Sequence, residues 1–369
     1  MSRQSAARRL AVTLRVVQAS FYRDPDGRTS AELLETWPTL PQVAGAVARA
    51  GVDITVVQAH ARQEQQSAHG VDIRFTPDVP AAIAELAPDV VHLHGLQFPL
   101  SIRELCRRNP ELPVLVQDHG GGAPARWRQP LLSLGLSRIR GAMFTAKEQA
   151  RAYQRVLPKH VQVFEVLESS CAFSPGDRAE ARAATGVHGD PAVLWVGRLD
   201  RNKDPFTALS AIKLAAQELP GIQLWCCFGD DSLLESVRAK VAGDDLLRTR
   251  VHLVGAVPHA MIEQFCRACD FFISTSHSES TGYALLEGLA CGLTPVVTDI
   301  PSHGAIIHAG EIGALAPIGD AHAMASALIR LAGQPRAALR NKASTHFQKH
   351  LTFDVIGTRL RGAYEAVLA

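Results

Sequence analysis

The chain has 369 residues, of which 47% are hydrophobic and 20% charged, a composition typical of globular proteins and not of disordered ones. It contains 38 lysines and arginines and 36 acidic residues, a net charge of +2, so the charge balance gives no reason to expect a nucleic acid as partner. Because this length exceeds one ordinary hydrophobic core, we expect two domains.

The sequence has no apolar run near the roughly 20 residues that a spanning helix needs. Arginines precede a short apolar stretch at the start, but that stretch contains Arg15 and Gln18 and continues as a strand-like pattern. We interpret it as a first core strand and not as a signal peptide. The seven cysteines form an odd, unevenly spaced set, which fits a reducing compartment. We therefore expect a cytoplasmic protein.

Short β-branched runs alternate with helical patterns through the first half of the chain. The expected strands are 10–19, 53–60, 89–94, 114–119, 142–145 and 161–167. Several of these runs are apolar on both faces, as the strands of a parallel sheet covered by helices must be. The alternation predicts a Rossmann-like βαβ domain over residues 1–170.

A stretch with proline, glycine and small polar residues, SSCAFSPGD, separates this half from a second alternating series. The expected strands of that series are 192–199, 222–229, 251–257, 270–276 and 294–299. We expect a second Rossmann-like domain over 171–347, and a terminal helix over 348–369 that returns to the first domain. The expected fold class is α/β, with two Rossmann-like domains facing a central cleft, where ligands bind at the carboxyl ends of the strands.

The stretch HSESTGYALLEGLACG sets two glutamates eight residues apart around a Gly-Tyr pair. Ser280 or Thr281 is expected to cap a helix, and Gly282 leaves its first turn open to a ligand. Unpaired N–H groups and the helix dipole favour a phosphate at this point. Glu279 would precede the helix, and Glu287 would lie about two turns along it, where a carboxylate can accept hydrogen bonds from a ribose diol.

Cations for a diphosphate must come from elsewhere in the chain. The run VGRLDRNKDP places Arg198 and Lys203 directly after the first strand of the second half. That position is on the same rim of the sheet as Glu279. An arginine fork together with a lysine point charge suits a diphosphate leaving group.

These motifs resemble those of a known family. The E-x7-E spacing of Glu279 and Glu287, with GLTPVV after it, resembles the motif of retaining glycosyltransferases of the GT-B fold, and large family 4 of the sugar-nucleotide transferases is the most similar. The GRL-x-x-x-K run, which contains Arg198 and Lys203, resembles that family's donor-phosphate pair. The resemblance is strongest over residues 190–300 and continues in layout over the first half.

The resemblance implies roles for the donor side. Glu287 would bind the ribose, and Arg198 and Lys203 the diphosphate. Glu279 would hold the transferred sugar with backbone N–H groups near Gly282, and the loop 255–258 would contact the base mainly through its backbone. The implied donor residues are Arg198, Lys203, Val257, Glu279, Thr281, Gly282, Tyr283 and Glu287.

On the acceptor side, His119 matches the position of a strand-end histidine that faces the reacting sugar in the family. His94, at another strand end, is a second candidate. Relatives usually carry a glycine pair in the first strand-to-helix loop, whereas this loop reads SFYRDPDG, with a single Gly27. Asp24 and Asp26 of that loop mimic the D-x-D of metal-dependent transferases, but the proline between them predicts a turn.

The resemblance implies a hexosyltransferase. It would move a sugar, with retention, from a UDP-, GDP- or similar nucleotide sugar to a hydroxyl acceptor, which is a glycan, a lipid-linked compound or a small molecule. Attack would come from the face of the leaving group, with no cofactor and no divalent metal. The catalytic set would be His119, Glu279, Arg198 and Lys203, of which the cations stabilise the leaving charge. A GT-B sugar-nucleotide epimerase and a non-catalytic nucleotide-sugar binding protein remain alternatives.

Three further features have simpler interpretations. His92, His94 and His119 could together hold a metal, but neither their spacing nor a nearby acid requires it, so we expect no metal. Cys266-x-x-Cys269 lacks a second pair nearby, which favours buried free thiols. The segment 124–140 carries four arginines, Trp127 and several leucines but no acid. Such a segment either contacts anionic lipid at the inner membrane face or packs on the cleft, and we favour packing.

Overall fold

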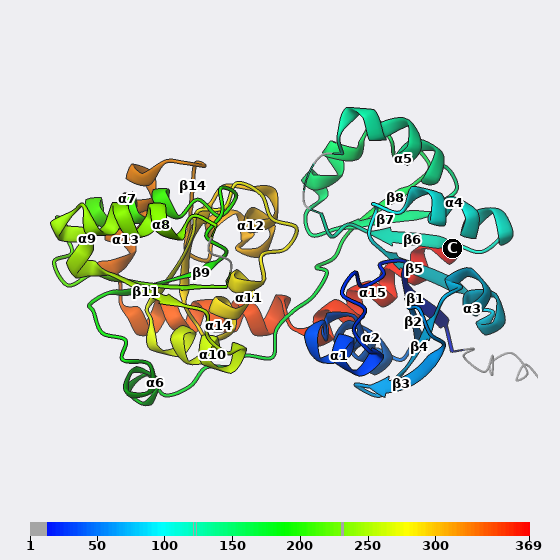
Figure 1. Cartoon of the computed structure of the whole chain (residues 1–369), viewed down its shortest axis with the longest axis horizontal. Helices are drawn as coiled ribbons and strands as arrows, with labels where there is room; N and C mark the ends of the chain where they lie inside the picture. Colours follow the sequence, from blue (N-terminus) through cyan, green and yellow to red (C-terminus); the bar gives the residue numbers. More distant parts are fainter. Residues whose placement is uncertain (1–12, 121, 123, 230–231) are drawn as a thin grey trace, which may run out of the picture.

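The computed structural model of the chain describes residues 13–120, 122, 124–229 and 232–369. The chain forms two α/β domains that lie side by side (Figure 1), so the expected fold class is confirmed. The expected first strand, 10–19, lies partly outside the described residues, and its described part is β1 (Arg15–Ser20).

The first domain is built on one eight-stranded sheet. Its further strands are β2 (Asp53–Ala59), β3 (Glu64–Ala68), β4 (Val71–Thr76), β5 (Val90–His94), β6 (Val114–Gln117), β7 (Gly141–Phe144) and β8 (Gln162–Glu165). Their order across the sheet is β3-β4-β2-β1-β5-β6-β7-β8, and the pairs are parallel except β3 with β4. The helices of this domain are α1 (Ser30–Thr36), α2 (Thr39–Arg49), α3 (Val79–Leu86), α4 (Pro99–Arg108) and α5 (Gln129–Gly135).

The sequence did not predict the β3–β4 hairpin. β3 reads EQQSA and lies at the edge of the sheet without a buried residue, so it lacks the apolar alternation that indicates a strand. β4 reads VDIRFT and buries Val71, Ile73 and Phe75, so its period of two was an available signal. The hairpin extends the sheet beyond β2 and provides part of the wall of a cavity described below.

The second domain has a six-stranded parallel sheet. Its strands are β9 (Ala192–Gly197), β10 (Gln223–Phe228), β11 (Val251–Gly255), β12 (Phe271–Ser274), β13 (Thr294–Thr298) and β14 (Ala314–Ala316), in the order β11-β10-β9-β12-β13-β14. Its helices are α6 (Arg178–Thr185), α7 (Pro205–Ala215), α8 (Leu234–Ala242), α9 (Asp245–Arg250), α10 (His259–Ala268), α11 (Tyr283–Ala290), α12 (Pro301–Ile306), α13 (Ala321–Ala332) and α14 (Arg336–His350).

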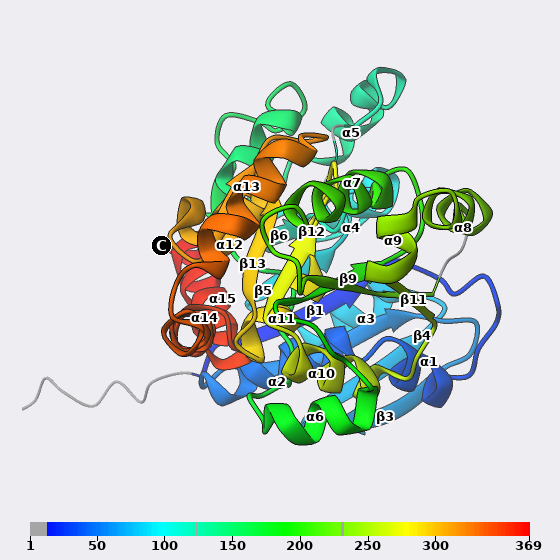
Figure 2. The same cartoon turned by 90° about the vertical axis from the view of Figure 1, so that its left-hand side faces the viewer.

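Helices cover both faces of the second sheet. In Figures 1 and 2, α7, α8, α9 and α13 lie above the sheet, while α6, α10 and α14 lie below it. The buried strand residues divide accordingly: Val193 and Leu224 pack with the upper helices, and Leu194 with the lower ones. This explains why the sequence of β10, QLWCCF, is buried at every position.

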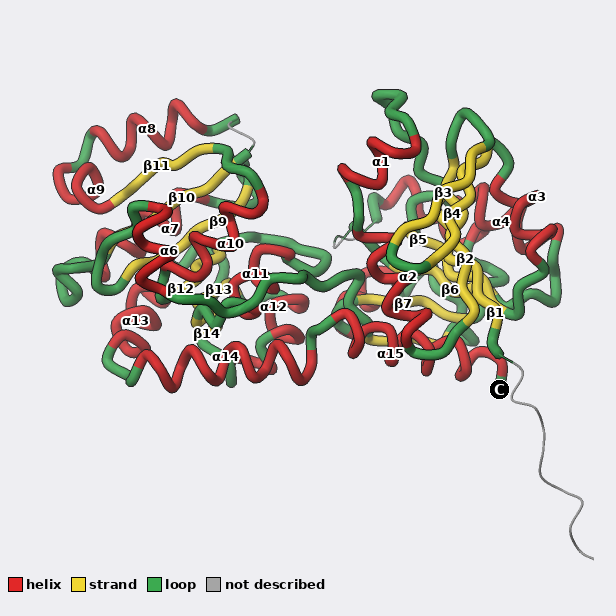
Figure 3. The backbone as a smooth tube through the Cα atoms, turned by 90° about the horizontal axis from the view of Figure 1, so that it is seen from below, coloured by secondary structure: helices red, strands yellow, loops and turns green. Residues whose placement is uncertain are grey.

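The chain ends by returning to the first domain. α14 continues through His350, and α15 (Phe353–Leu368) then packs on α2 (Figure 3). The boundary that the sequence placed at 347 therefore falls inside α14. A Cβ at Gly357 of α15 would collide with the carbonyl oxygen of Ala46, so glycine permits this close helix contact. The hydroxyl of Tyr364 also accepts a hydrogen bond of 3.0 Å from Gln18 of β1.

Each sheet changes its winding direction at one point. β1 lies between β2 and β5, and β9 lies between β10 and β12. At such points the loops that follow adjacent strands leave to opposite sides, which opens a crevice at the carboxyl ends of the strands. The residues that follow β1 and β5 in one domain, and β9 and β12 in the other, are therefore placed to form a site.

Candidate active site

A cavity of about 450 Å³ in the second domain is lined by residues that follow β9, β10, β11 and β12. Most of the expected donor residues line it, namely Arg198, Lys203, Val257, Glu279, Tyr283 and Glu287. The cavity therefore brings together both cations and both glutamates that the sequence singled out.

Lys203 and Glu279 form an ion pair inside this cavity. The ammonium of Lys203 donates to Oε1 of Glu279, and both side chains are largely buried. Arg198 instead pairs with Asp200 at 3.1 Å, and its side chain is 60% exposed. Because the guanidinium lies in solvent, it can turn toward an anionic ligand at little cost, whereas Lys203 is already held in place.

Hydrogen bonds to backbone carbonyls connect the two loops that carry this pair. The hydroxyl of Thr275 donates to the carbonyl of Lys203 at 2.7 Å, and the amide of Asn202 donates to the carbonyl of Ser278 at 3.0 Å. The N–H of His277 also donates to the carbonyl of Asn202 at 2.8 Å. The loop after β9 and the loop after β12 therefore form one unit.

The N-terminus of α11 is not capped by a side chain. Its N-cap is Gly282, with φ of +84° and no side-chain hydrogen bond, so the expected cap at Ser280 or Thr281 was wrong. Their hydroxyls bond elsewhere: Ser280 donates to Glu168 at 2.6 Å, and Thr281 lies 2.7 Å from the hydroxyl of Thr145. A Cβ at Gly282 would meet its nearest neighbour only at 3.6 Å, so the positive φ and not lack of space requires glycine.

His303 of α12 lies beside this helix terminus, and the sequence did not indicate it. Its Nδ1–H donates to the carbonyl of Thr298 at 3.0 Å. Burial lowers the pKa of His303 to about 4, so the imidazole is neutral near pH 7. Its Nε2 therefore carries a lone pair close to Gly282 and can accept a hydrogen bond from a hydroxyl.

Glu287 has an exposed partner that the sequence also missed. Its Oε1 lies 2.6 Å from Nε2 of His259, the first residue of α10. This hydrogen bond raises the pKa of His259. The His259 side chain is 70% exposed while that of Glu287 is mostly buried. The histidine can therefore move away and leave the carboxylate to a ligand.

Glu168 joins the two domains and is the largest omission of the sequence analysis. It lies after β8, with 3% of its surface exposed. Its Oε2 is 2.6 Å from Nδ1 of His119, and its Oε1 accepts from Ser280 of the donor loop. Gln149 of the first domain also donates to the carbonyls of Glu279 and Ser280, at 3.1 Å each. A buried glutamate in the apolar run VFEVLESS was the available signal.

The histidines of the first domain form a chain with Glu168. Nε2 of His119 lies 2.9 Å from Nδ1 of His94. Because Nδ1–H of His119 donates to Glu168, Nε2 of His119 is an acceptor, and Nδ1–H of His94 donates to it. Nε2 of His94 is then a buried acceptor without a partner among the described residues. His92 takes no part in this chain: its Nδ1 lies 2.8 Å from the hydroxyl of Tyr364, and burial lowers its pKa to about 3.

A second cavity, of about 290 Å³, adjoins these histidines. It is lined by His94, His119, Glu168 and Tyr283, while most of its wall is apolar and includes Leu33, Leu34, Trp37, Leu40, Phe75 and Phe98. Because Tyr283 also lines the cavity of the second domain, the two cavities meet at the first residue of α11.

Gly27 is not part of this arrangement. It lines a separate cavity of the first domain together with His60 and Arg62. Asp24 and Asp26 both pair with Arg28, at 2.7 Å each, so this loop is a turn closed by its own ion pairs. From the loop, Tyr22 reaches the apolar cavity instead.

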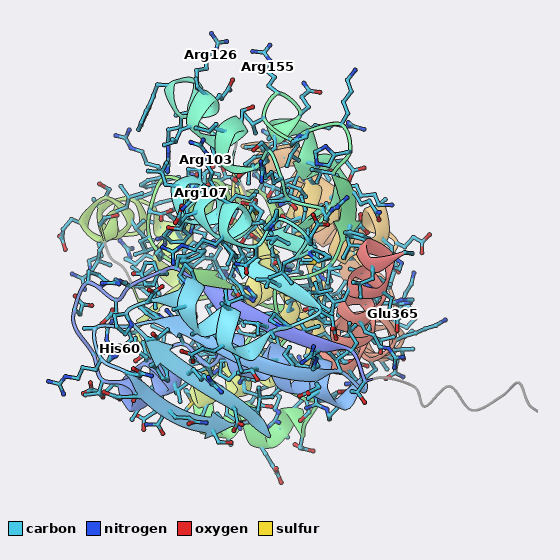
Figure 4. The ribbon with its side chains drawn as sticks, turned by 90° about the vertical axis from the view of Figure 1, so that its right-hand side faces the viewer. His60, Arg103, Arg107, Arg126, Arg155 and Glu365 are labelled. Carbon is cyan, nitrogen blue, oxygen red and sulfur yellow. The ribbon has the colours of Figure 1, made fainter. Side chains whose placement is uncertain are left out.

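The segment 124–140 does not pack on the cleft as the sequence analysis favoured. Trp127 is 81% exposed, and Leu131 and Leu134 of α5 are also exposed. Figure 4 shows Arg126 and Arg155 projecting outward at this end of the first domain, with Arg103 and Arg107 below them on α4. In the part of the chain that the structure describes, no helix is long and apolar enough to cross a membrane.

The cysteines agree with the interpretation as free thiols. Cys266 and Cys269 are buried, and none of the seven cysteines forms a disulfide. Burial raises the pKa of the Cys269 thiol, which makes it unreactive.

Comparison with known proteins gives a consistent result. Residues 177–349 match the family described as "Glycosyl transferases group 1". The D-inositol 3-phosphate glycosyltransferase of Acidothermus cellulolyticus is 26% identical over 342 residues, 79% of this chain and 76% of that protein. The GDP-mannose:cellobiosyl-diphosphopolyprenol alpha-mannosyltransferase of Xanthomonas oryzae pv. oryzae is 24% identical over 62% of this chain, a match that spans 60% of its own length.

Solved structures share the fold over nearly the whole chain. Sucrose-phosphate synthase from Thermosynechococcus elongatus has a TM-score of 0.72 at 19% identity, covering 96% of this chain and 99% of that one. Anabaena HepE in complex with UDP and glucose has a TM-score of 0.70 at 15% identity, covering 96% and 100%. The chain is a glycosyltransferase of the GT-B fold, and residues 177–349 of its second domain match the glycosyl transferases group 1 family.

Proposed function

We propose that the protein transfers a sugar, with retention of anomeric configuration, from a nucleoside-diphosphate sugar to a hydroxyl acceptor. One observation carries the proposal: Arg198, Lys203, Glu279 and Glu287 line one cavity beside an uncapped helix N-terminus. The diphosphate lies against Arg198, Lys203 and the first N–H groups of α11, and the ribose bonds to Glu287. The sugar lies between Glu279 and His303.

The fixed charges of the site account for the rate enhancement. As the bond to the anomeric carbon breaks, negative charge grows on the β-phosphate. Lys203 is held by Glu279, and the α11 N–H groups are held by the helix, so both stabilise this charge without reorganising. Removing one such donor typically lowers kcat by about 10²–10³. These groups supply the charge that a divalent metal supplies in other transferases, and we propose that no metal is needed for transfer.

The acceptor hydroxyl enters from the apolar cavity and attacks on the face from which the diphosphate leaves. Its proton passes to an oxygen of the leaving β-phosphate, while the new glycosidic bond replaces the bond to that phosphate. The ion pair with Lys203 argues against Glu279 as a covalent nucleophile, because a nucleophilic carboxylate must be free to approach the anomeric carbon. Nε2 of His94, which has no partner among the described residues, is placed to bond the incoming hydroxyl.

The wall of the acceptor cavity indicates the chemistry of the acceptor. Trp37, Leu40, Phe75 and Phe98 offer few hydrogen-bonding groups. A plain glycan would leave its own hydroxyls unpaired there, at a cost of roughly 1–3 kcal/mol each. We therefore propose an acceptor whose reacting hydroxyl is attached to an apolar group, as in lipid-linked compounds or aromatic small molecules.

The exposed apolar and basic side chains around α5 support peripheral contact with anionic lipid. Trp127, Leu131 and Leu134 are exposed beside Arg126 and Arg128, the combination found at membrane interfaces. We propose that the protein works in the cytoplasm with this end against the inner membrane face, where a lipid-linked acceptor would be presented.

A donor screen tests the proposal. UDP-, GDP-, ADP- and dTDP-sugars are compared by thermal shift with a chelator present, and the stabilising donor is then incubated with apolar acceptor alcohols. The expected result is stabilisation by one nucleotide class and formation of a product with retained configuration. Conversion of the donor without any acceptor would indicate an epimerase. Binding without transfer or donor hydrolysis would indicate a binding protein, and an inverted product would contradict the retaining mechanism.

A further inference from the structure

Three histidines gather at the C-terminal end of α14. His346 and His350 lie on this helix, and His308 lies in the turn after α12. Their ring centroids are 4.4, 4.9 and 5.0 Å apart. One ring nitrogen of each lies within 4.8 Å of those of the other two, and no other group of three potential metal ligands in the described residues is spaced in this way.

The geometry of the cluster follows from the sequence. His346 and His350 are four residues apart, so they lie on one face of α14, one turn above the other. His308 and Ala309 have φ of +48° and +51°, a conformation that is costly for residues other than glycine and persists only where the surroundings impose it. The turn holds His308 opposite the helical pair.

One hydrogen bond fixes the ring of His346 in a form that can bind a metal ion. Its Nε2–H donates to the carbonyl of Ile306 at 2.7 Å, which leaves the lone pair on Nδ1. Histidines that bind metals almost always donate their other N–H to a carbonyl or carboxylate in this way.

We propose that His308, His346 and His350 form a site for a divalent transition-metal ion that prefers imidazole ligands, such as zinc. Three nitrogen ligands leave a fourth position to water. His308 is exposed and His350 partly exposed, so both side chains can rotate to close on one ion. None of the three lines the cavity of Arg198 and Lys203, so this ion is separate from the transfer reaction.

The position of the site suggests what the ion would do. α14 leads directly into the crossing to α15 (Figure 3), and the carbonyl of Leu351 at that crossing accepts from Ser170 at 2.6 Å. Ile306, the partner of His346, ends the helix that carries His303. An ion bound to His308 and α14 would brace the interdomain crossing against the helix beside the donor site.

Metal titration of the purified full chain tests this inference. Calorimetry with Zn²⁺ and visible absorption with Co²⁺ are measured for the wild type and for His350→Ala, His308→Ala and His322→Ala. His322 is an exposed histidine on α13 outside the cluster, so its variant is the matched control. Circular dichroism without metal checks that each variant is folded.

The expected result is one ion per chain, with the intense absorption of four-coordinate cobalt. Affinity should fall about 100-fold in His350→Ala and His308→Ala, by analogy with losses at metal sites, and should stay unchanged in His322→Ala. Bound metal should also raise the melting temperature of the wild type and of His322→Ala, and should raise it less in His350→Ala and His308→Ala. No stoichiometric binding, or equal affinity in the wild type and His350→Ala, would overturn the proposal. These readouts do not depend on transfer activity.

Discussion

The donor and acceptor cavities of this protein meet at Tyr283 but differ in the charge and polarity of the side chains that line them. The donor cavity is lined with paired charges, of which Arg198 and the partner of Glu287 are exposed. The acceptor cavity is mostly apolar, and its polar lining includes the half-buried His94 and His119 and the buried Glu168. In the proposed function, a diphosphate is recognised by charge at a helix terminus, which donors of many sugars can share. The proposed acceptor is selected by shape and by a few buried polar atoms.

The largest effect is expected from removing the carboxylate at the centre of the donor cavity. In Glu279→Ala, nucleotide binding should persist, because Arg198, Lys203 and the α11 terminus remain. Transfer should fall by about 10³-fold, because the sugar loses its contact and Lys203 its fixed position. Donor affinity by calorimetry and initial transfer rates measure the two effects. Wild-type turnover in Glu279→Ala would remove Glu279 from the site.

A second variant, in Glu168, tests the acceptor side of the site. Glu168→Gln keeps the size of the side chain but removes the charge that orients His119. We expect kcat to fall about 100-fold, because the chain from Glu168 through His119 no longer orients His94 toward the acceptor hydroxyl, and a misplacement of about 1 Å can cost this much in rate. Glu165→Gln, at the end of β8, is the control. A lower melting temperature with unchanged kcat and an unchanged KM for the acceptor would make Glu168 purely structural.

The outcome at Glu168 bears on what a sequence can predict. The donor residues fall in two short windows, around 198–203 and 279–287, where spacing alone places them on adjacent strand ends. Glu168, His303 and His259 are joined to the site only by folding, because their partners lie 49, 21 and 28 positions away. The neighbours in the site are His119 for Glu168, Gly282 for His303 and Glu287 for His259. No local pattern marks His259 or His303, and only its place in an apolar run marks Glu168.

The fold shows the same division. The strongly apolar strands were predicted because burial on both faces leaves a clear pattern. The edge strand β3 has too little apolar content to be recognised, and β14 has only three residues, too few to show a pattern. The helix cap was misplaced because the hydroxyls of Ser280 and Thr281 bond to the other domain, and such tertiary contacts override a local capping preference.

Glu287 provides the next test on the donor side. Glu287→Ala should raise the KM for the donor by about 10- to 100-fold and leave kcat nearly unchanged, because hydrogen bonds to a charged group contribute about 1.5–3 kcal/mol and the ribose does not react. Steady-state kinetics with donor varied at saturating acceptor measure this. Glu235→Ala, on the exposed face of α8, is the control. An equal fall in kcat would mean that Glu287 acts on the transition state.

The exposed end of the first domain predicts a binding effect outside both cavities. Trp127→Ala should weaken sedimentation with anionic vesicles at low salt by about 10-fold, since burying such a side chain contributes roughly 1.5–3 kcal/mol. Ile318→Ala, an exposed apolar residue of the second domain, should not change it. If the wild type fails to bind anionic vesicles at low salt, the membrane contact is wrong.

The smallest effect is expected from a change of pH. It distinguishes the two cavities, because the exposed pair that titrates, His259 with Glu287, lies on the donor side. The hydrogen bond from Glu287 raises the pKa of His259. The pair therefore stabilises the ligand-free protein fully below pH 6.5, the ordinary value, and this stabilisation is lost as the pH rises through the raised pKa of His259.

Above that pKa, His259 is neutral and competes less with the ribose for Glu287. The KM for the donor should consequently fall as the pH rises through this range. The change should be only about two- to threefold, because solvent screens a pair with so exposed a member. In His259→Ala the KM should be independent of pH in this window, whereas His322→Ala should follow the wild type. A KM that rises with pH in the wild type would show that the histidine assists donor binding instead of competing with it.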